Sequence, residues 1–251
     1  MITRVKTAKE ISAMRESGKM LASVLVILKK QLAVGMSTKA VADIARDELK
    51  KMGGTPAFLG YQGFPDVVCI SINDEVVHGI PKTGKIINDG DIVGLDFGVQ
   101  YKGMITDAAV SIIAGRPKQT GHIRLLKDTE AALLAGIESV HDKVRTGDIG
   151  SVIEASLQHR QYGIVRDLVG HGVGHYVHED PNIPNFGRPN TGPWLSTGMT
   201  IAIEPMVTLG TDKVYIADDG WTVLTTDGSY AAHFEHTILV TDTGAEILTT
   251  A

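Results

Sequence analysis

The second half of the chain repeats the order of the first half, and this duplication limits the fold more than any other feature. Residues 7–33 carry apolar side chains at helical spacing, and a glycine break at Gly35 precedes a second helical stretch. Residues 121–144 and 144–163 repeat this pair, with Gly147 at the place that we take to correspond to Gly35. Segments rich in β-branched residues follow each pair. We therefore expect an α+β fold with a pseudo-twofold duplicated helix–helix–sheet unit, in which helices cover the outer face of antiparallel sheets.

Two matched strands carry an acid at the same point. Gly90 precedes Asp96 by six residues in "GDIVGLD", and Gly198 precedes Glu204 by six residues in "GMTIAIE". Asp is disfavoured in strands, so an acid at the same strand position in both halves suggests that the two acids share a chemical task.

The composition limits the class of protein. A chain of 251 residues with 43% hydrophobic and 21% charged residues is typical of a soluble globular protein. The net charge of −5 argues against nucleic-acid binding, and the single Cys69 has no partner for an internal disulfide. Residues 1–20 do not resemble a signal peptide, and no apolar run is long enough for a membrane span. We expect a cytoplasmic monomer with one catalytic domain, residues 1–251, whose halves span about 1–115 and 116–251.

The first half also predicts a pair of facing acids. If "GLDFGVQYKGMITDA" forms a hairpin that turns at Tyr101 and Lys102, with Gly103 beside the turn, Asp96 lies directly opposite Asp107. Like charges in this position destabilise a sheet, and the flanking residues are apolar. Either a cation lies between the two carboxylates, or one of them holds a proton. The alternative is that both acids end their strands and face solvent.

Two further acids and a histidine cluster extend this pattern. Glu204 lies in the apolar run "IAIEPMV", and Glu235 lies in "AHFEHTIL". The stretch "VGHGVGHYVHEDP" contains His171, His175 and His178, but its glycines favour an extended or irregular backbone over a helix. Mixed carboxylate and imidazole ligands suit divalent metals.

These segments resemble the methionine aminopeptidase family, in its short bacterial type I form. The resemblance covers essentially the whole chain and implies the pseudo-symmetric "pita bread" fold. It rests on "CISINDEVVHGIP" (69–81), "LDFGVQYKGMITDAA" (95–109), "VGHGVGHYVHEDPNIPN" (169–185), "GMTIAIEPM" (198–206) and "HFEHTILVT" (233–241).

The resemblance implies a site for two divalent ions, held by Asp96, Asp107, His171, Glu204 and Glu235. Asp107 and Glu235 would bridge the ions, and a water or hydroxide between them would attack the peptide bond. Glu204 would also move protons. Mn, Fe, Co and Zn all suit these ligands.

The implied reaction removes methionine from the N-termini of nascent polypeptides and peptides, with a preference for a small second residue and with transient proximity to the ribosome. His78 and His178 would contact the scissile peptide. His175 is expected to be a bystander. Four other histidines are expected to be solvent-exposed: His122, His141, His159 and His233.

The motif "LGYQGFP" resembles the family's methionine pocket. The pocket residues that it implies are Tyr61, Phe64, Cys69 and Trp221, although plain core packing is the alternative. Phe58 is larger and Val177 smaller than is usual at these positions in the family. We expect Phe58 to supply the pocket wall that Val177 gives up.

Two other functions fit parts of the pattern. A proline-specific aminopeptidase of the same fold would share the metal motif, but it would usually carry an extra N-terminal domain, for which 251 residues leave no room. It would also lack the pocket motif. A non-catalytic binding protein of this fold would be expected to have lost metal ligands, whereas all five are present.

Overall fold

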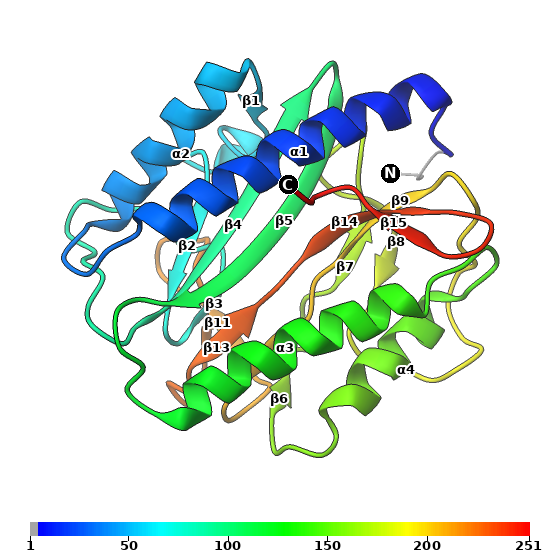
Figure 1. Cartoon of the computed structure of the whole chain (residues 1–251). Helices are drawn as coiled ribbons and strands as arrows, with labels where there is room; N and C mark the ends of the chain where they lie inside the picture. Colours follow the sequence, from blue (N-terminus) through cyan, green and yellow to red (C-terminus); the bar gives the residue numbers. More distant parts are fainter. Residues whose placement is uncertain (1–4) are drawn as a thin grey trace.

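The computed structural model describes residues 5–251. Residues 1–4, which begin both the polar stretch 1–20 and the predicted domain, lie outside the described residues. Each half begins with two helices and continues in strands, so the predicted order is confirmed (Figure 1). The helices are α1 (Ala8–Gln31), α2 (Thr38–Met52), α3 (Thr120–Glu138) and α4 (Thr146–Leu157). Within residues 5–251, no helix is both long and apolar enough to cross a membrane.

Local sequence explains where the first two helices begin and end. The hydroxyl of Thr7 accepts the Glu10 N–H at 3.4 Å, and the Glu10 carboxylate accepts the Thr7 N–H at 2.7 Å, which completes a capping box. Ser37 caps α2 by accepting the Ala40 N–H at 3.1 Å. The second helix ends at Gly53, which has φ 80°.

The strands form four antiparallel groups. The first-half group has β4 (Ile92–Tyr101) at its centre, paired with β1 (Thr55–Pro56), β2 (Cys69–Ile72) and β5 (Met104–Ile113). The largest second-half group has the order β15 (Ala245–Ile247), β14 (His236–Val240), β9 (Thr200–Ile203), β7 (Gly170–Gly172), β8 (Glu179–Ile183). Two three-stranded groups complete the fold. They are β13 (Ala231–His233), β10 (Met206–Thr208), β6 (Gly163–Ile164), and β11 (Val214–Ile216), β12 (Val223–Thr225), β3 (Glu75–Val77).

The two halves correspond at an offset of 108 residues. Isolated bridges at Ser37 and at Arg145, each just before the second helix of its half, set this correspondence. Gly35 therefore matches Lys143, and both have positive φ, 91° and 62°. The predicted match of Gly35 to Gly147 is wrong, because Gly147 lies in the first turn of α4. A left-handed backbone position favours glycine without requiring it, so glycine alone was a poor guide to which residues of the two halves correspond.

The hairpin between β4 and β5 turns one residue later than predicted. Its central residues are Lys102 and Gly103, with φ of 50° and 82°, and Tyr101 is still part of β4. Positive φ at both central residues is the requirement of the turn that matches the twist of paired strands. Gly103 takes the second of these positions, rather than lying beside the turn.

This later turn shifts the register by two residues. Asp96 pairs with Ala109, and Asp107 pairs with Gly98, so the predicted direct pairing of Asp96 with Asp107 is wrong. Because side chains alternate with period two, a shift of two leaves both carboxylates on the same face, as diagonal neighbours.

The helices and the candidate site lie on opposite faces of β4. Leu95, Phe97 and Val99 are fully buried in the apolar cluster beneath α1 and α2. The corresponding cluster of the second half packs α3 and α4 against strands that include Ile201 and Ile203. Alternation along β4 therefore turns Asp96 away from the helices.

Candidate metal centre and adjoining pocket

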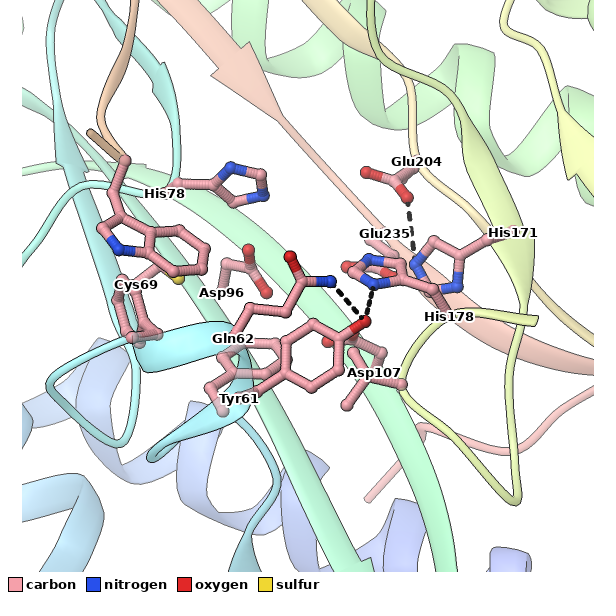
Figure 2. Close-up of a pocket in the computed structure, with 14 residues that line it drawn as sticks. Tyr61, Gln62, Cys69, His78, Asp96, Asp107, His171, His178, Glu204 and Glu235 are labelled. Carbon is pink, nitrogen blue, oxygen red and sulfur yellow. Dashed lines mark hydrogen bonds and ion pairs between the residues drawn. The ribbon is translucent and has the colours of Figure 1, made fainter. Parts of the chain in front are cut away.

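One pocket gathers all thirteen residues that the sequence singles out, and Figure 2 shows it. They are Phe58, Tyr61, Phe64, Cys69, His78, Asp96, Asp107, His171, Val177, His178, Glu204, Trp221 and Glu235. The fourteenth lining residue is Gln62, which the sequence did not indicate. The pocket combines an acidic floor, three histidines and an apolar slot.

The acids come from strands of both halves. Asp96 lies on β4 and Asp107 on β5. Glu204 lies between β9 and β10, and Glu235 between β13 and β14. Because Ile203 pairs with His236, extending that ladder by one residue places Glu204 opposite Glu235.

Three of the acids are buried and incompletely hydrogen-bonded. Asp96, Asp107 and Glu235 are 9%, 3% and 2% exposed. One carboxylate oxygen of each, Oδ1 of Asp96 and Asp107 and Oε1 of Glu235, has no hydrogen-bond partner among residues 5–251. A buried charge without a partner is costly, so a cation among these oxygens would relieve that cost.

The acids resist ionisation when no cation is present. Burial, and then the charge of Glu204, raises the pKa of Asp107 to about 8. Burial also raises the pKa of Glu204 to about 8. For Asp96 and Glu235, burial and the neighbouring carboxylates raise the pKa well above its ordinary value. Four acids with raised pKa values in one pocket are typical of a site built around positive charge.

His171 presents one ring nitrogen to this cluster. Its Nδ1 donates to the carbonyl oxygen of Gly172 at 2.9 Å, which leaves the lone pair on Nε2. That Nε2 lies 3.4 Å from Oε1 of Glu204. Burial lowers the pKa of His171 to about 3, so the ring is neutral. Ligand atoms of His171, Asp107 and Glu235 all lie within 4.8 Å of one another, a spacing and donor set that fit a divalent cation.

His78 and His178 lie on opposite sides of the pocket (Figure 2). His78 has a left-handed backbone, φ 59°, which is uncommon outside glycine and recurs at functional sites. Burial lowers the pKa of His78 to about 4. Desolvation by the surrounding protein lowers the pKa of His178 as well, although this residue is partly exposed to solvent. Both rings are therefore neutral hydrogen-bonding groups at neutral pH.

An apolar slot adjoins the acids. The rings of Phe64 and Trp221 meet edge to face, with centroids 5.2 Å apart. Cys69 is 4% exposed, and burial raises the pKa of its thiol, so it lines the slot as a thiol. Phe58 and Val177 are buried in the same cluster. Soft and aromatic walls of this kind suit a thioether side chain.

The structure corrects the assignment of two histidines. His122 and His233 are each 4% exposed, whereas solvent exposure was expected. His233 lies on β13, and its Nε2 is 3.4 Å from Oε2 of Glu204. Alternation along the strand could have revealed it, because residues two apart, here His233 and Glu235, share a face. The expectation of exposure is confirmed for His141 and His159.

The histidine segment is extended, as its glycines predicted. His171 lies on β7, and the following residues form bends rather than a helix. His175 does not line the pocket, and its Nε2 lies 2.8 Å from Oε1 of Glu10 instead.

Glu179 is a residue that sequence reasoning missed. Its side chain is 1% exposed and accepts from Lys6 Nζ at 2.7 Å. Its other oxygen accepts the backbone N–H groups of His175 and Tyr176 at 2.7 and 3.2 Å. Glu179 thereby fixes the loop that carries Val177 and His178.

The comparisons with known proteins agree with this geometry. The model of metallopeptidase family M24 matches residues 12–242. The chain is 43% identical to methionine aminopeptidase 1 of Bacillus subtilis, over 97% of this chain and 98% of that protein. Its fold matches the crystal structure of methionine aminopeptidase from Thermotoga maritima with TM-score 0.97 and 43% identity, covering all of both chains. The prolidase of Pyrococcus furiosus, at 23% identity and TM-score 0.79, covers 98% of this chain and 65% of its own and shares the fold alone.

Proposed function

Because this chain belongs to metallopeptidase family M24, we propose that it is a methionine aminopeptidase that removes methionine from the N-termini of nascent polypeptides and peptides. One observation carries the proposal. Buried carboxylate oxygens that find no hydrogen-bond partner in the described part of the chain, residues 5–251, adjoin an apolar slot lined by aromatic rings and a thiol. The first group can hold cations, and the second can hold a methionine side chain.

Each acid has a proposed role toward two divalent ions. Asp107 and Glu235 would bridge them, Asp96 would hold one ion, and His171 and Glu204 would hold the other. The grouping of Asp107, His171 and Glu235 within 4.8 Å supports the position of the ion that His171 would hold. When bound, such ions supply Lewis-acid polarisation and lower the pKa of water. Mn, Fe, Co and Zn all suit these ligand types.

The protein's own groups would bind and orient the substrate and move its protons. Glu204, with its raised pKa, suits the transfer of a proton to the departing amine. His178 would donate a hydrogen bond to the scissile carbonyl oxygen, where negative charge develops. His78 would orient the amide from the opposite side. Tyr61, Phe64, Cys69, Trp221, Phe58 and Val177 would enclose the methionine side chain.

The site also supports a proposal about the whole chain. Its acids come from both halves, 1–115 and 116–251, so we propose that residues 1–251 act as one catalytic unit. We further propose a cytoplasmic monomer with a preference for a small second residue and with transient ribosome proximity.

A peptide series tests the proposed substrate against the proline-specific alternative. Purified protein with added divalent metal is incubated with Met-Gly-, Met-Leu- and Ala-Pro-initiated peptides, and the released amino acid is quantified. We expect methionine release that is fastest from the Met-Gly peptide and no alanine release from the Ala-Pro peptide. Preferential cleavage before proline would support the alternative function and overturn ours.

A further inference from the structure

Three side chains at the mouth of the pocket form a short hydrogen-bond relay (Figure 2). Nε2 of Gln62 donates to the hydroxyl oxygen of Tyr61 at 3.1 Å. The same hydroxyl lies 2.8 Å from Nδ1 of His178. The Tyr61 and His178 rings also touch, with centroids 5.4 Å apart.

The donor from Gln62 favours one direction for the relay. An amide nitrogen can only donate, so the Tyr61 oxygen accepts from Gln62 and its single proton is left for His178. When that proton lies between the two groups, Nδ1 of His178 accepts it, and the one proton of the neutral imidazole is on Nε2. In the other arrangement the Tyr61 proton points to solvent and Nδ1 donates to the second lone pair of the Tyr61 oxygen. Within residues 5–251, that Nε2 makes no hydrogen bond of its own.

Gln62 has an unusual backbone conformation. It lies in the short helix η1 (Tyr61–Gly63) with φ 47°, in the left-handed region that is uncommon for a residue other than glycine. The side chain is exposed, so apolar packing does not explain why this conformation is held. The conformation closes a tight turn, in which the Phe64 N–H donates to the Tyr61 carbonyl oxygen at 2.9 Å, and it also places the Gln62 amide beside the Tyr61 hydroxyl.

We propose that Gln62 and Tyr61 are positioning residues that hold His178 in the tautomer with its proton on Nε2. This inference rests on the proposed function, in which that N–H faces an oxygen of the substrate. A ring with its proton on Nδ1 would present a lone pair to the oxygen and repel it. Tyr61 then has two tasks, because its ring lines the apolar slot while its hydroxyl orients a histidine.

Nitrogen-15 NMR of the full-length protein tests the proton placement without relying on activity. The protein is labelled on histidine ring nitrogens and measured metal-free and zinc-loaded, with the His178 resonances assigned by comparison with His178→Asn. We expect the shift of an unprotonated nitrogen at Nδ1 and of a protonated nitrogen at Nε2. A proton on Nδ1 of the wild-type protein would overturn the proposal.

Three variants separate the relay from the packing of the pocket. Tyr61→Phe keeps the ring and removes the hydroxyl, so the two His178 nitrogen shifts should move toward each other. Gln62→Glu keeps the shape but can only accept, which should reverse the relay and move the proton to Nδ1. Gln62→Met, which has no donor, should give an intermediate pattern. Unchanged shifts in both Tyr61→Phe and Gln62→Glu would refute the relay.

The kinetics provide a second readout. Tyr61→Phe should lower kcat about tenfold while the KM for a Met-Gly peptide changes less than about twofold, because only the transition-state hydrogen bond weakens. A rise in KM with unchanged kcat would mean that Tyr61 acts only as pocket wall and would count against the proposal. If the wild-type tautomer is as expected but no methionine is released, the proposed function fails and the relay stands.

Discussion

Ala109 and Glu235 exchange both of their backbone hydrogen bonds across the line where the two halves meet. The Ala109 N–H donates to the backbone carbonyl oxygen of Glu235 at 3.3 Å, and the Glu235 N–H donates to the carbonyl oxygen of Ala109 at 2.9 Å. Ala109 pairs with Asp96 in the first half, and the extended ladder places Glu235 opposite Glu204 in the second. The residues that face Asp96 and Glu204 across their ladders thus bond to each other, and the acids converge on one site.

The histidine cluster gives a matched pair of variants. His171→Ala should weaken the binding of divalent ions by at least about 100-fold, since even groups behind a metal ligand typically contribute 10–100-fold. His175→Ala should leave the metal content unchanged, because that ring contacts Glu10 rather than the acids. Metal content after equilibrium dialysis, measured by atomic emission, checks both. Equal metal loss in the two variants would contradict the assignment of His171.

The stability of the metal-free protein should fall as the pH rises from 7 to 8.5. In the folded chain Asp107 and Glu204 hold protons up to a pKa of about 8, whereas in the unfolded chain both are ionised at pH 7. A pKa raised by folding stabilises the protein at low pH, and this stability is lost as the pH passes the folded value. The loss is about 1.4 kcal/mol per pH unit for each proton held. Denaturant titrations at several pH values measure it.

The histidines allow a control on this slope. Burial lowers the pKa of His171 to about 3, so it opposes the acids only below its unfolded value near 6.5. At pH 7 and above the neutral histidines no longer oppose the fall, and the buried thiol of Cys69, whose pKa is raised by burial, adds to it toward pH 8.5. Saturating metal should abolish the fall, and Asp96→Asn should reduce it. A metal-free protein that becomes more stable between pH 7 and 8.5 would be inconsistent with the buried acids described above.

Periodic and local features of this fold could be predicted from the sequence. The exact residues of a turn, and the strand register that depends on them, could not. The shared face of Asp96 and Asp107 follows from period-two alternation, so it survives a register error of two residues. The register itself depends on which residues take positive φ, and Lys102 gave no sign that it would. Gly103 did carry the signal, since glycine is favoured at the second position of such a turn.

Contacts between segments that are distant in the sequence could not be predicted either. Lys6 and Glu179 are 173 residues apart, and nothing in either segment indicates their pairing. The thirteen pocket residues could be named because the resemblance to a family supplied them. Gln62 lies within the motif "LGYQGFP", but the resemblance implied no role for it.

Breaking the Lys6–Glu179 pair should destabilise the protein strongly. Both side chains are almost fully buried, at 0% and 1% exposure, so Lys6→Met leaves an uncompensated buried carboxylate at a cost of about 3–5 kcal/mol. Glu179→Gln combined with Lys6→Met should recover part of this loss, because glutamine is neutral and still accepts the backbone N–H groups. Denaturant unfolding of the two single variants and the double variant measures the coupling. Additive losses would show that the pair does not act as a unit.

Phe58 should form part of the methionine pocket. Phe58→Ala should raise the KM for a Met-Gly peptide about 10-fold or more, the range expected for lost contact in an apolar pocket. Adding Val177→Phe should restore part of the affinity, since both side chains are buried in one cluster beside the acids. Steady-state kinetics on the two variants test this. An unchanged KM and methionine preference in Phe58→Ala would show that Phe58 is core packing only.

The most direct test of the central claim is methionine release before and after metal removal. The protein is stripped with a chelator, dialysed, and assayed on a Met-Gly peptide with Mn, Fe, Co or Zn restored singly, alongside Asp96→Asn. We expect no release without metal, recovery with at least one ion, and at least about 100-fold less release by the variant. Full activity in the stripped protein, or in Asp96→Asn, would contradict a metal-dependent aminopeptidase built on these acids.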